Sequence, residues 1–142
     1  MMTAENKRPY LLRITTLNRG WYDRDMLLLH AAFQILVDFI EKECSPGPVD
    51  WKSDAEHTRV RTELQKLYGW WTKKRPARKS PLDEYIGKLS TERKDETDKE
   101  WLREVTKFNR VADRHEKLED KWDIEDQAML TLLVQRRKWL WT

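Results

Sequence analysis

The chain has 142 residues, of which 39% are hydrophobic and 37% are charged, and its formal net charge is +3. Four glycines and five prolines are too few for the many turns of an all-β sandwich, and the lone Cys44 excludes an intramolecular disulfide. We therefore expect one all-α domain over residues 1–142, a bundle of four or five helices with a long C-terminal helix.

The start of the chain and its longest apolar stretch both indicate a cytoplasmic protein that does not contact membranes. No apolar signal-peptide region follows the polar residues 1–8. The stretch 26–40 has 15 residues and contains His30, Gln34 and Asp38. A membrane span needs about 20 apolar residues. We therefore interpret this stretch as a buried core helix.

The first elements are an arm and a central helix. Residues 9–17 are short and mixed, so they predict either a short strand or part of an extended arm over 1–20. Asp23 or Asp25 can cap a helix over 26–43, which ends before the Ser-Pro-Gly-Pro segment 45–48. Because this helix is apolar on nearly every side at its start, we expect it to be the central helix of the bundle.

Two further helices follow in the middle of the chain. Ser53 and Glu56 form a predicted capping box, in which each side chain satisfies the other's backbone amide. The helix that follows carries one apolar stripe and ends by Pro76 at the latest; the stripe is Val60, Leu64, Leu67 and Trp71. Ser80-Pro81 predicts an N-cap and first helical residue for a short helix to about residue 89.

The last part of the chain contains the longest periodic segment. Residues 90–98 are almost wholly polar and predict a loop. Thr97 and Glu100 form a second predicted capping box, and no Gly or Pro occurs from 101 to 142. The apolar stripe weakens at Glu125 and Asp126, so either one long helix continues there or two helices meet. The absence of breakers favours one continuous helix.

Tryptophan is unusually frequent, with eight residues. Trp71, Trp101 and Trp122 lie on apolar stripes, so we interpret them as core anchors. Adjacent helical side chains point about 100° apart, so Trp70 and Trp71 are not expected on one stripe. This leaves Trp70, together with Trp139 and Trp141, as candidates for a surface role.

A basic and aromatic run over 68–79, YGWWTKKRPARK, is the best candidate for a ligand site. Cations attract phosphates, and aromatic faces stack on bases. We predict a surface for a phosphate-bearing ligand, either a signalling nucleotide or nucleic acid, made of Trp70, Lys73, Lys74, Arg75 and Arg78 with help from Arg136, Arg137 and Trp139. The alternative interpretation is a solvated helix end whose cations interact with the helix dipole.

An acidic cluster between 113 and 126 raises the possibility of an enzyme. Carboxylates at helical spacing can hold Mg²⁺, as in all-α pyrophosphohydrolases of the MazG type. Here Asp38 and Glu41 would have to supply the second half of the site, and Lys117 and Lys121 interrupt the first. We therefore predict an exposed acidic face, no metal, no cofactor and no enzymatic activity. His30 and His115 fall on apolar faces and are interpreted as core histidines.

Residues 27–41, LLLHAAFQILVDFIE, together with the Trp-rich middle and the final Leu140-Trp141-Thr142, resemble uncharacterised bacteriophage proteins. The resemblance implies a phage accessory protein that acts in the bacterial cytoplasm. Proteins of this kind often modulate host enzymes or counter host defences, and one class sequesters signalling nucleotides. The expected function is thus non-enzymatic binding of a phosphate-bearing ligand. A protein-binding modulator of a host protein, and a Mg²⁺-dependent pyrophosphohydrolase, are the alternatives, and a homo-oligomer is compatible with each.

Overall fold

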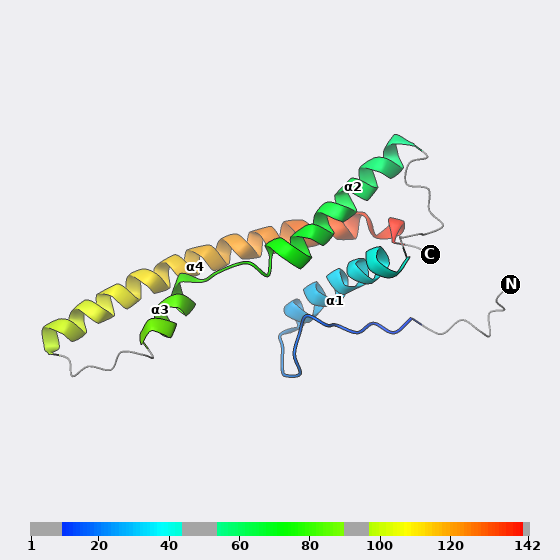
Figure 1. Ribbon diagram of the computed structural model, residues 1–142. Coiled ribbons are helices and arrows are strands. Elements are labelled where there is room, and N and C mark those ends of the chain that lie inside the picture. Colours follow the sequence, from blue (N-terminus) through cyan, green and yellow to red (C-terminus); the bar gives the residue numbers. More distant parts are fainter. Residues whose placement is uncertain (1–9, 44–53, 90–96, 141–142) are drawn as a thin grey trace. The chain divides into compact units, whose positions relative to one another are not determined.

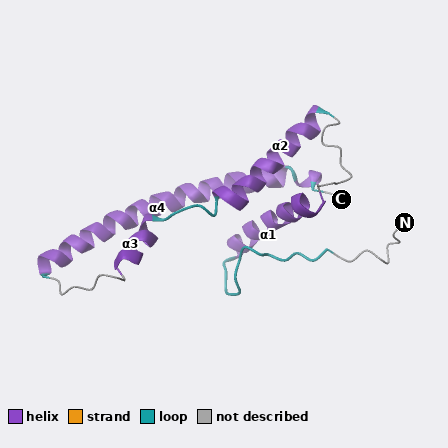
Figure 2. Cartoon of the chain, viewed as in Figure 1, coloured by secondary structure: helices purple, strands orange, loops and turns teal. Residues whose placement is uncertain are grey.

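The computed structural model describes residues 10–43, 54–89 and 97–140, and within these ranges all regular structure is helical (Figures 1 and 2). Its four α-helices are α1 (Arg24–Asp38), α2 (Ala55–Gly69), α3 (Pro81–Leu89) and α4 (Asp98–Gln135). Two π-helical turns, Phe39–Glu43 and Trp70–Lys74, continue α1 and α2, and a 3-10 turn, Arg137–Trp139, follows α4. The predicted all-α fold with a long C-terminal helix is confirmed.

The described chain divides into two compact units. The first contains residues 1–71 and 130–142, and the second contains residues 72–129. The first unit therefore holds α1, α2 and the end of α4, whereas the second holds α3 and most of α4. Within the described residues, no helix combines the length and the apolarity that crossing a membrane requires.

Local capping signals set the helix starts much as expected. The side chains of Thr97 and Glu100 each accept a hydrogen bond from the other's backbone amide, so this capping box is confirmed. Ser80 accepts from the amide of the second residue of α3 at 3.2 Å. At α2 the cap is Asp54, which accepts from the His57 amide at 2.7 Å. The predicted cap Ser53 lies outside the described residues.

The first unit is built around Phe33 of α1, which is fully buried. The Trp71 ring stacks on Phe33 at 4.6 Å and an interplanar angle of 12°, and the Trp70 ring packs on it at 5.3 Å and 53°. Both tryptophans are buried, so the expectation that they would not share one face is wrong. They lie in a π-helical turn, and the Phe33 ring is in contact with both indoles. The other buried apolar residues are Leu29, Leu36, Phe39, Val60, Leu64, Leu67 and Leu133.

Helix α1 is not covered on all sides, contrary to expectation. Leu28 is 64% exposed, and Ile35, which lies two turns further along the same face, is also exposed. The reason is that α2 covers only one side of the helix, while another side is polar and holds the N-terminal arm.

Asp23 is the N-cap of α1, although its side chain makes no capping hydrogen bond.

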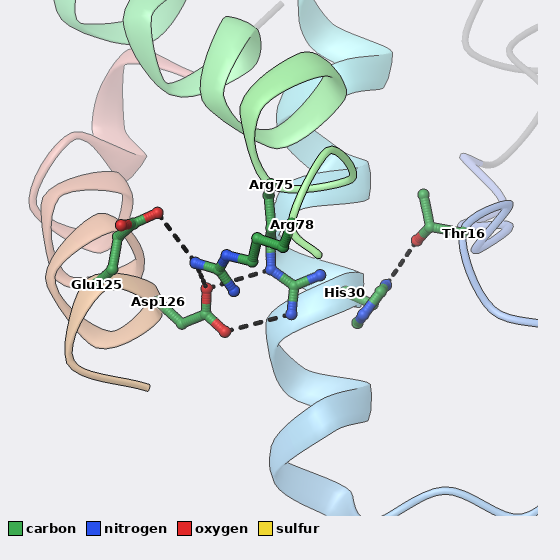
Figure 3. Close-up of polar contacts among 6 residues, drawn as sticks. All are labelled: Thr16, His30, Arg75, Arg78, Glu125 and Asp126. Atoms are coloured by element: carbon green, nitrogen blue, oxygen red, sulfur yellow. Dashed lines mark hydrogen bonds and ion pairs between the residues drawn. The ribbon is translucent and has the colours of Figure 1, made fainter. Parts of the chain in front are cut away.

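The N-terminal arm, residues 10–17, has no regular secondary structure and is held on α1 by side-chain hydrogen bonds. The arm bonds a buried polar stripe on α1, whose members are four residues apart and share one face: His30, Gln34 and Asp38. The hydroxyl of Thr16 lies 2.6 Å from His30 Nδ1, Thr15 donates twice to Gln34 Oε1, and the Tyr10 hydroxyl donates to Asp38 at 2.5 Å. The Thr16–His30 contact is drawn in Figure 3. Over residues 10–17 the structure thus has an extended arm and no strand, and its contacts satisfy polar groups that the core would otherwise leave unpaired.

Asp38 should make the stability of the first unit depend on acid. Burial raises the pKa of Asp38, but hydrogen bonds from Tyr10 and Gln34 and the nearby Lys42 outweigh it, so the pKa lies below the ordinary 3.8. The unfolded state then binds the proton more readily, so this contribution is complete above about pH 4 and is lost as the pH falls through the folded-state pKa. Urea unfolding between about pH 6 and pH 2 should show a steeper acid loss for the wild type than for Asp38→Asn. Equal acid slopes would contradict this assignment.

In the second unit, α3 docks on α4 through two polar contacts. Glu119 accepts from His115 Nε2 at 3.1 Å, so in the neutral ring Nδ1 is free to accept the Ser80 hydroxyl at 2.5 Å. Because Ser80 also caps α3 and is buried, this series of contacts attaches the start of α3 to α4. In the middle of α3, the Tyr85 hydroxyl donates to Glu104 at 2.8 Å. The interpretation of His30 and His115 as core histidines is correct for His30, which is buried, whereas His115 is half-buried and bonded to Ser80 and Glu119.

Candidate functional site

The aromatic members of the predicted ligand surface are not available for stacking. Trp70 is only 3% exposed, because it packs on Phe33 in the core of the first unit. Trp139 is half-buried, and its ring meets the His57 ring edge-on at 4.9 Å. Periodicity could not reveal either contact, since both partners lie far away in the sequence.

Two of the four arginines of the predicted surface, Arg75 and Arg78, are held by the acidic cluster (Figure 3). Arg75 makes a forked contact to Asp126, with nitrogen–oxygen distances of 3.1 and 3.2 Å. Arg78 donates to Asp126 at 2.8 Å and to Glu125 at 3.0 Å, and its guanidinium lies 5.4 Å from the centre of the Trp122 ring. Burial lowers the pKa of Arg78, but the hydrogen bonds to both carboxylates raise it by more. These cations are therefore engaged within the second unit.

The cations predicted near the C-terminus fall in the first unit. Arg136 forms a forked ion pair with Glu63 of α2, and this hydrogen bond holds the pKa of Glu63 below its ordinary value. Arg137 is exposed in the 3-10 turn. In the second unit, Lys73 and Lys74 are also exposed. Three of the eight predicted residues thus keep an exposed charge, and they are divided between the two units.

The acidic cluster is only partly the exposed face that we expected. Glu116, Asp120 and Asp123 are exposed, but Asp126 is largely buried by its two arginine partners. On α1, Asp38 is bonded to the arm, and Glu41 beyond it accepts from Tyr68 at 2.8 Å. Among the residues that the structure describes, no group of three or more His, Cys, Asp or Glu side chains is arranged to hold a metal ion.

The interpretation of three tryptophans as core anchors is correct for Trp71 and wrong for Trp101. Trp101 is 59% exposed and Phe108, two turns further along α4, is also exposed. In the second unit the helix packed beside α4 is α3, which has only nine residues, so much of the apolar stripe of α4 stays uncovered. Trp122 is half-buried beneath Arg78.

The most extensive charged feature of the second unit is a line of cations along α4, which we call the basic stripe. Its seven members recur every three or four residues, so they share one face of the helix. All are exposed, and none makes an ion pair with another described residue, although the Lys107 ammonium lies 5.9 Å from the centre of the Tyr85 ring. They are Lys99, Arg103, Lys107, Arg110, Arg114, Lys117 and Lys121.

The basic stripe is long and unbroken, because α4 is α-helical throughout residues 98–135 and Figure 1 draws it without a kink. At 1.5 Å per residue, the stripe extends over roughly 33 Å with a cation about every 5–6 Å. Glu125 lies one turn after Lys121 on α4 and forms an ion pair with Arg78. Lys79, the next residue after Arg78, is exposed. The segment that carried the predicted cations therefore contributes a charge near the end of the stripe.

The signal for the basic stripe was present in the sequence. Its spacing of 4, 4, 3, 4, 3 and 4 residues is as regular as that of an apolar stripe. It is hidden in the sequence because acidic residues alternate with the cations along the chain and keep the local net charge small. The cations are seen to share one face only when the residues are placed on an uninterrupted helix.

The chain was compared with protein families, curated proteins and solved structures. No protein-family model, no curated protein and no solved structure matches the chain.

Proposed function

We propose that the chain is a non-enzymatic nucleic-acid-binding protein whose contact surface is the basic stripe of α4. The observation that carries the proposal is the set of seven exposed cations on one helix face, without ion-pair partners among the described residues. Phosphate contacts supply most of the sequence-independent affinity of proteins for nucleic acids, through release of condensed counterions. A polymer suits these cations better than a small nucleotide, because they form a line of roughly 33 Å.

The resemblance of residues 27–41 to bacteriophage proteins suggests where this binding would take place, namely in a bacterial cell that a phage has infected. An accessory protein that coats host or phage nucleic acid in the bacterial cytoplasm could shield it from host defences. The net charge of +3 is small, so the attraction depends on how the charges are arranged on α4 rather than on their sum.

Neutralising the middle of the basic stripe should weaken binding strongly. In Arg110→Gln/Arg114→Gln, two phosphate contacts are lost, so the affinity for a labelled 20-base-pair DNA should fall roughly 10- to 100-fold at low salt. The slope of log K against log salt concentration should become shallower by about two, since each phosphate contact contributes about 0.9. Fluorescence anisotropy between about 50 and 200 mM salt measures both quantities.

The matched control removes the same charge elsewhere. Arg61→Gln/Lys66→Gln changes two exposed cations of α2 and should leave affinity and salt slope nearly unchanged. Lys73→Gln/Lys74→Gln tests the cations that the sequence singled out. The proposal is overturned if the wild type binds no nucleic acid, or if the α4 double variant and the α2 double variant lose the same amount of affinity for DNA. It is also overturned if vesicles rich in phosphatidylserine bind the protein more tightly than DNA does.

A second candidate function, binding to a partner protein, rests on the apolar surface of the second unit. Ile86, Trp101, Leu102 and Phe108 are exposed, and exposed apolar groups of this size commonly mark protein interfaces. Tryptophan is also enriched among residues that dominate interface energies. Capture of a protein that is lost in Trp101→Ser and kept in the basic-stripe variant would favour this candidate.

A further inference from the structure

We infer that the polymer recognised by the basic stripe is double-stranded nucleic acid, contacted through its phosphates without selection of bases. This inference rests on the proposed function and adds the form of nucleic acid. Three features of the second unit support it: the position of the aromatic rings, the straightness of α4, and the acidic residues beside the stripe.

The aromatic rings of α4 lie on the side of the helix away from the basic stripe. At about 100° per residue, Trp101, Phe108 and Trp122 fall within roughly 60° of one another and roughly 110–170° from the centre of the stripe. Proteins that bind single strands combine cations with aromatic rings on which the bases stack, worth about 1–3 kcal/mol per base. Beside the stripe the described residues offer one ring, that of Tyr85 on α3, which lies 5.9 Å from the Lys107 ammonium and whose hydroxyl is bonded to Glu104. One ring does not stack a run of bases, so the stripe favours a polymer whose bases are already stacked and paired.

The straightness of α4 favours a stiff partner. The basic stripe has no Gly or Pro and lies in uninterrupted α-helix, so its seven charges keep a fixed order over roughly 33 Å. Duplex DNA has a persistence length of about 150 base pairs, so a segment of this length is already straight. A flexible single strand would lose conformational freedom when aligned with the same charges, which reduces its affinity.

The acidic residues beside the basic stripe restrict how a duplex can approach. Asp113, Glu116, Asp120 and Asp123 recur three or four residues apart and face roughly 100° from the stripe. Inserted into a groove, α4 would bring these carboxylates against the phosphates of the second strand, because a groove has phosphates on both sides. The helix therefore contacts the outer backbone with one edge, where no base edges are within reach.

The test compares a 20-base-pair DNA duplex with each of its single strands by anisotropy, using the full chain at about 100 mM salt. We expect the duplex to bind at least tenfold more tightly than either strand. A second duplex of unrelated sequence and equal length should bind within about threefold of the first. The salt slope for the duplex should be near −4, as expected if about four or five of the seven cations reach phosphates.

Further measurements separate this inference from the proposed function. A variant that neutralises the acidic edge, Asp120→Asn/Asp123→Asn, should strengthen duplex binding severalfold, whereas Asp83→Asn/Glu84→Gln on α3 should change it less. An RNA duplex of the same length should also bind, because both duplexes present phosphates along a stiff backbone. Single strands that bind as tightly as the duplex, or a tenfold preference between duplex sequences, would overturn the inference and leave the proposed function standing. Absence of binding to every nucleic acid would overturn both.

Discussion

Replacing Phe33 by alanine should lower the free energy of unfolding of the first unit by about 4 kcal/mol. Phe33 is fully buried and contacts both Trp70 and Trp71, so its removal leaves a cavity between two large rings. Typical domains are stable by only about 5–15 kcal/mol, so a loss of this size is a large part of the total. Urea unfolding followed by circular dichroism at 222 nm should therefore show a much lower midpoint.

The control for this prediction is on the same helix. Leu28→Ala removes a side chain that is 64% exposed, so it should cost less than about 1 kcal/mol. A loss of less than about 1 kcal/mol for Phe33→Ala as well would mean that the packing of α1 against the two tryptophans does not stabilise the protein.

Removing the hydroxyl groups of the arm should destabilise the first unit by roughly 3 kcal/mol in total. In Tyr10→Phe/Thr15→Val/Thr16→Val the arm keeps its shape, but the buried stripe of α1 loses its hydroxyl partners; that stripe is His30, Gln34 and Asp38. A buried polar group without a partner costs about 1–3 kcal/mol, and water that enters beside the half-exposed arm offsets part of this. Thermal and urea unfolding measure the loss.

Two controls distinguish the arm contacts from a general effect of removing hydroxyls. Thr62→Val and Thr106→Val each remove a hydroxyl that bonds a backbone carbonyl one turn earlier in its own helix. Both should change the stability by less than about 0.5 kcal/mol. If the triple variant is as stable as these controls, the hydrogen bonds between arm and α1 do not contribute to folding.

The acid dependence of the triple variant provides a second readout. The hydrogen bond from Tyr10 is one of the contacts that hold the pKa of Asp38 below its ordinary value. Without it the difference between the folded and unfolded pKa shrinks, so less stability is lost as the pH falls below about 4. The triple variant should therefore show a flatter acid limb than the wild type.

Periodicity and capping residues predict the helices and several of their ends. The Thr97–Glu100 box, the Ser80-Pro81 start and the unbroken segment after Trp101 depend on neighbours within one turn, so periodicity and capping predict them well. These features are local, and local preferences act before any long-range contact is made.

Which charged and aromatic residues remain exposed depends on contacts between residues far apart in the sequence. Arg75 and Asp126 are 51 positions apart, and Glu63 and Arg136 are 73 apart, so no local pattern shows that they pair. Trp70 became a core residue because the fold places Phe33 beside it. The basic stripe follows from the sequence once α4 is known to be continuous. It stays exposed because α3 and the segment before it contact α4 through other side chains, among them Glu104, His115 and Asp126.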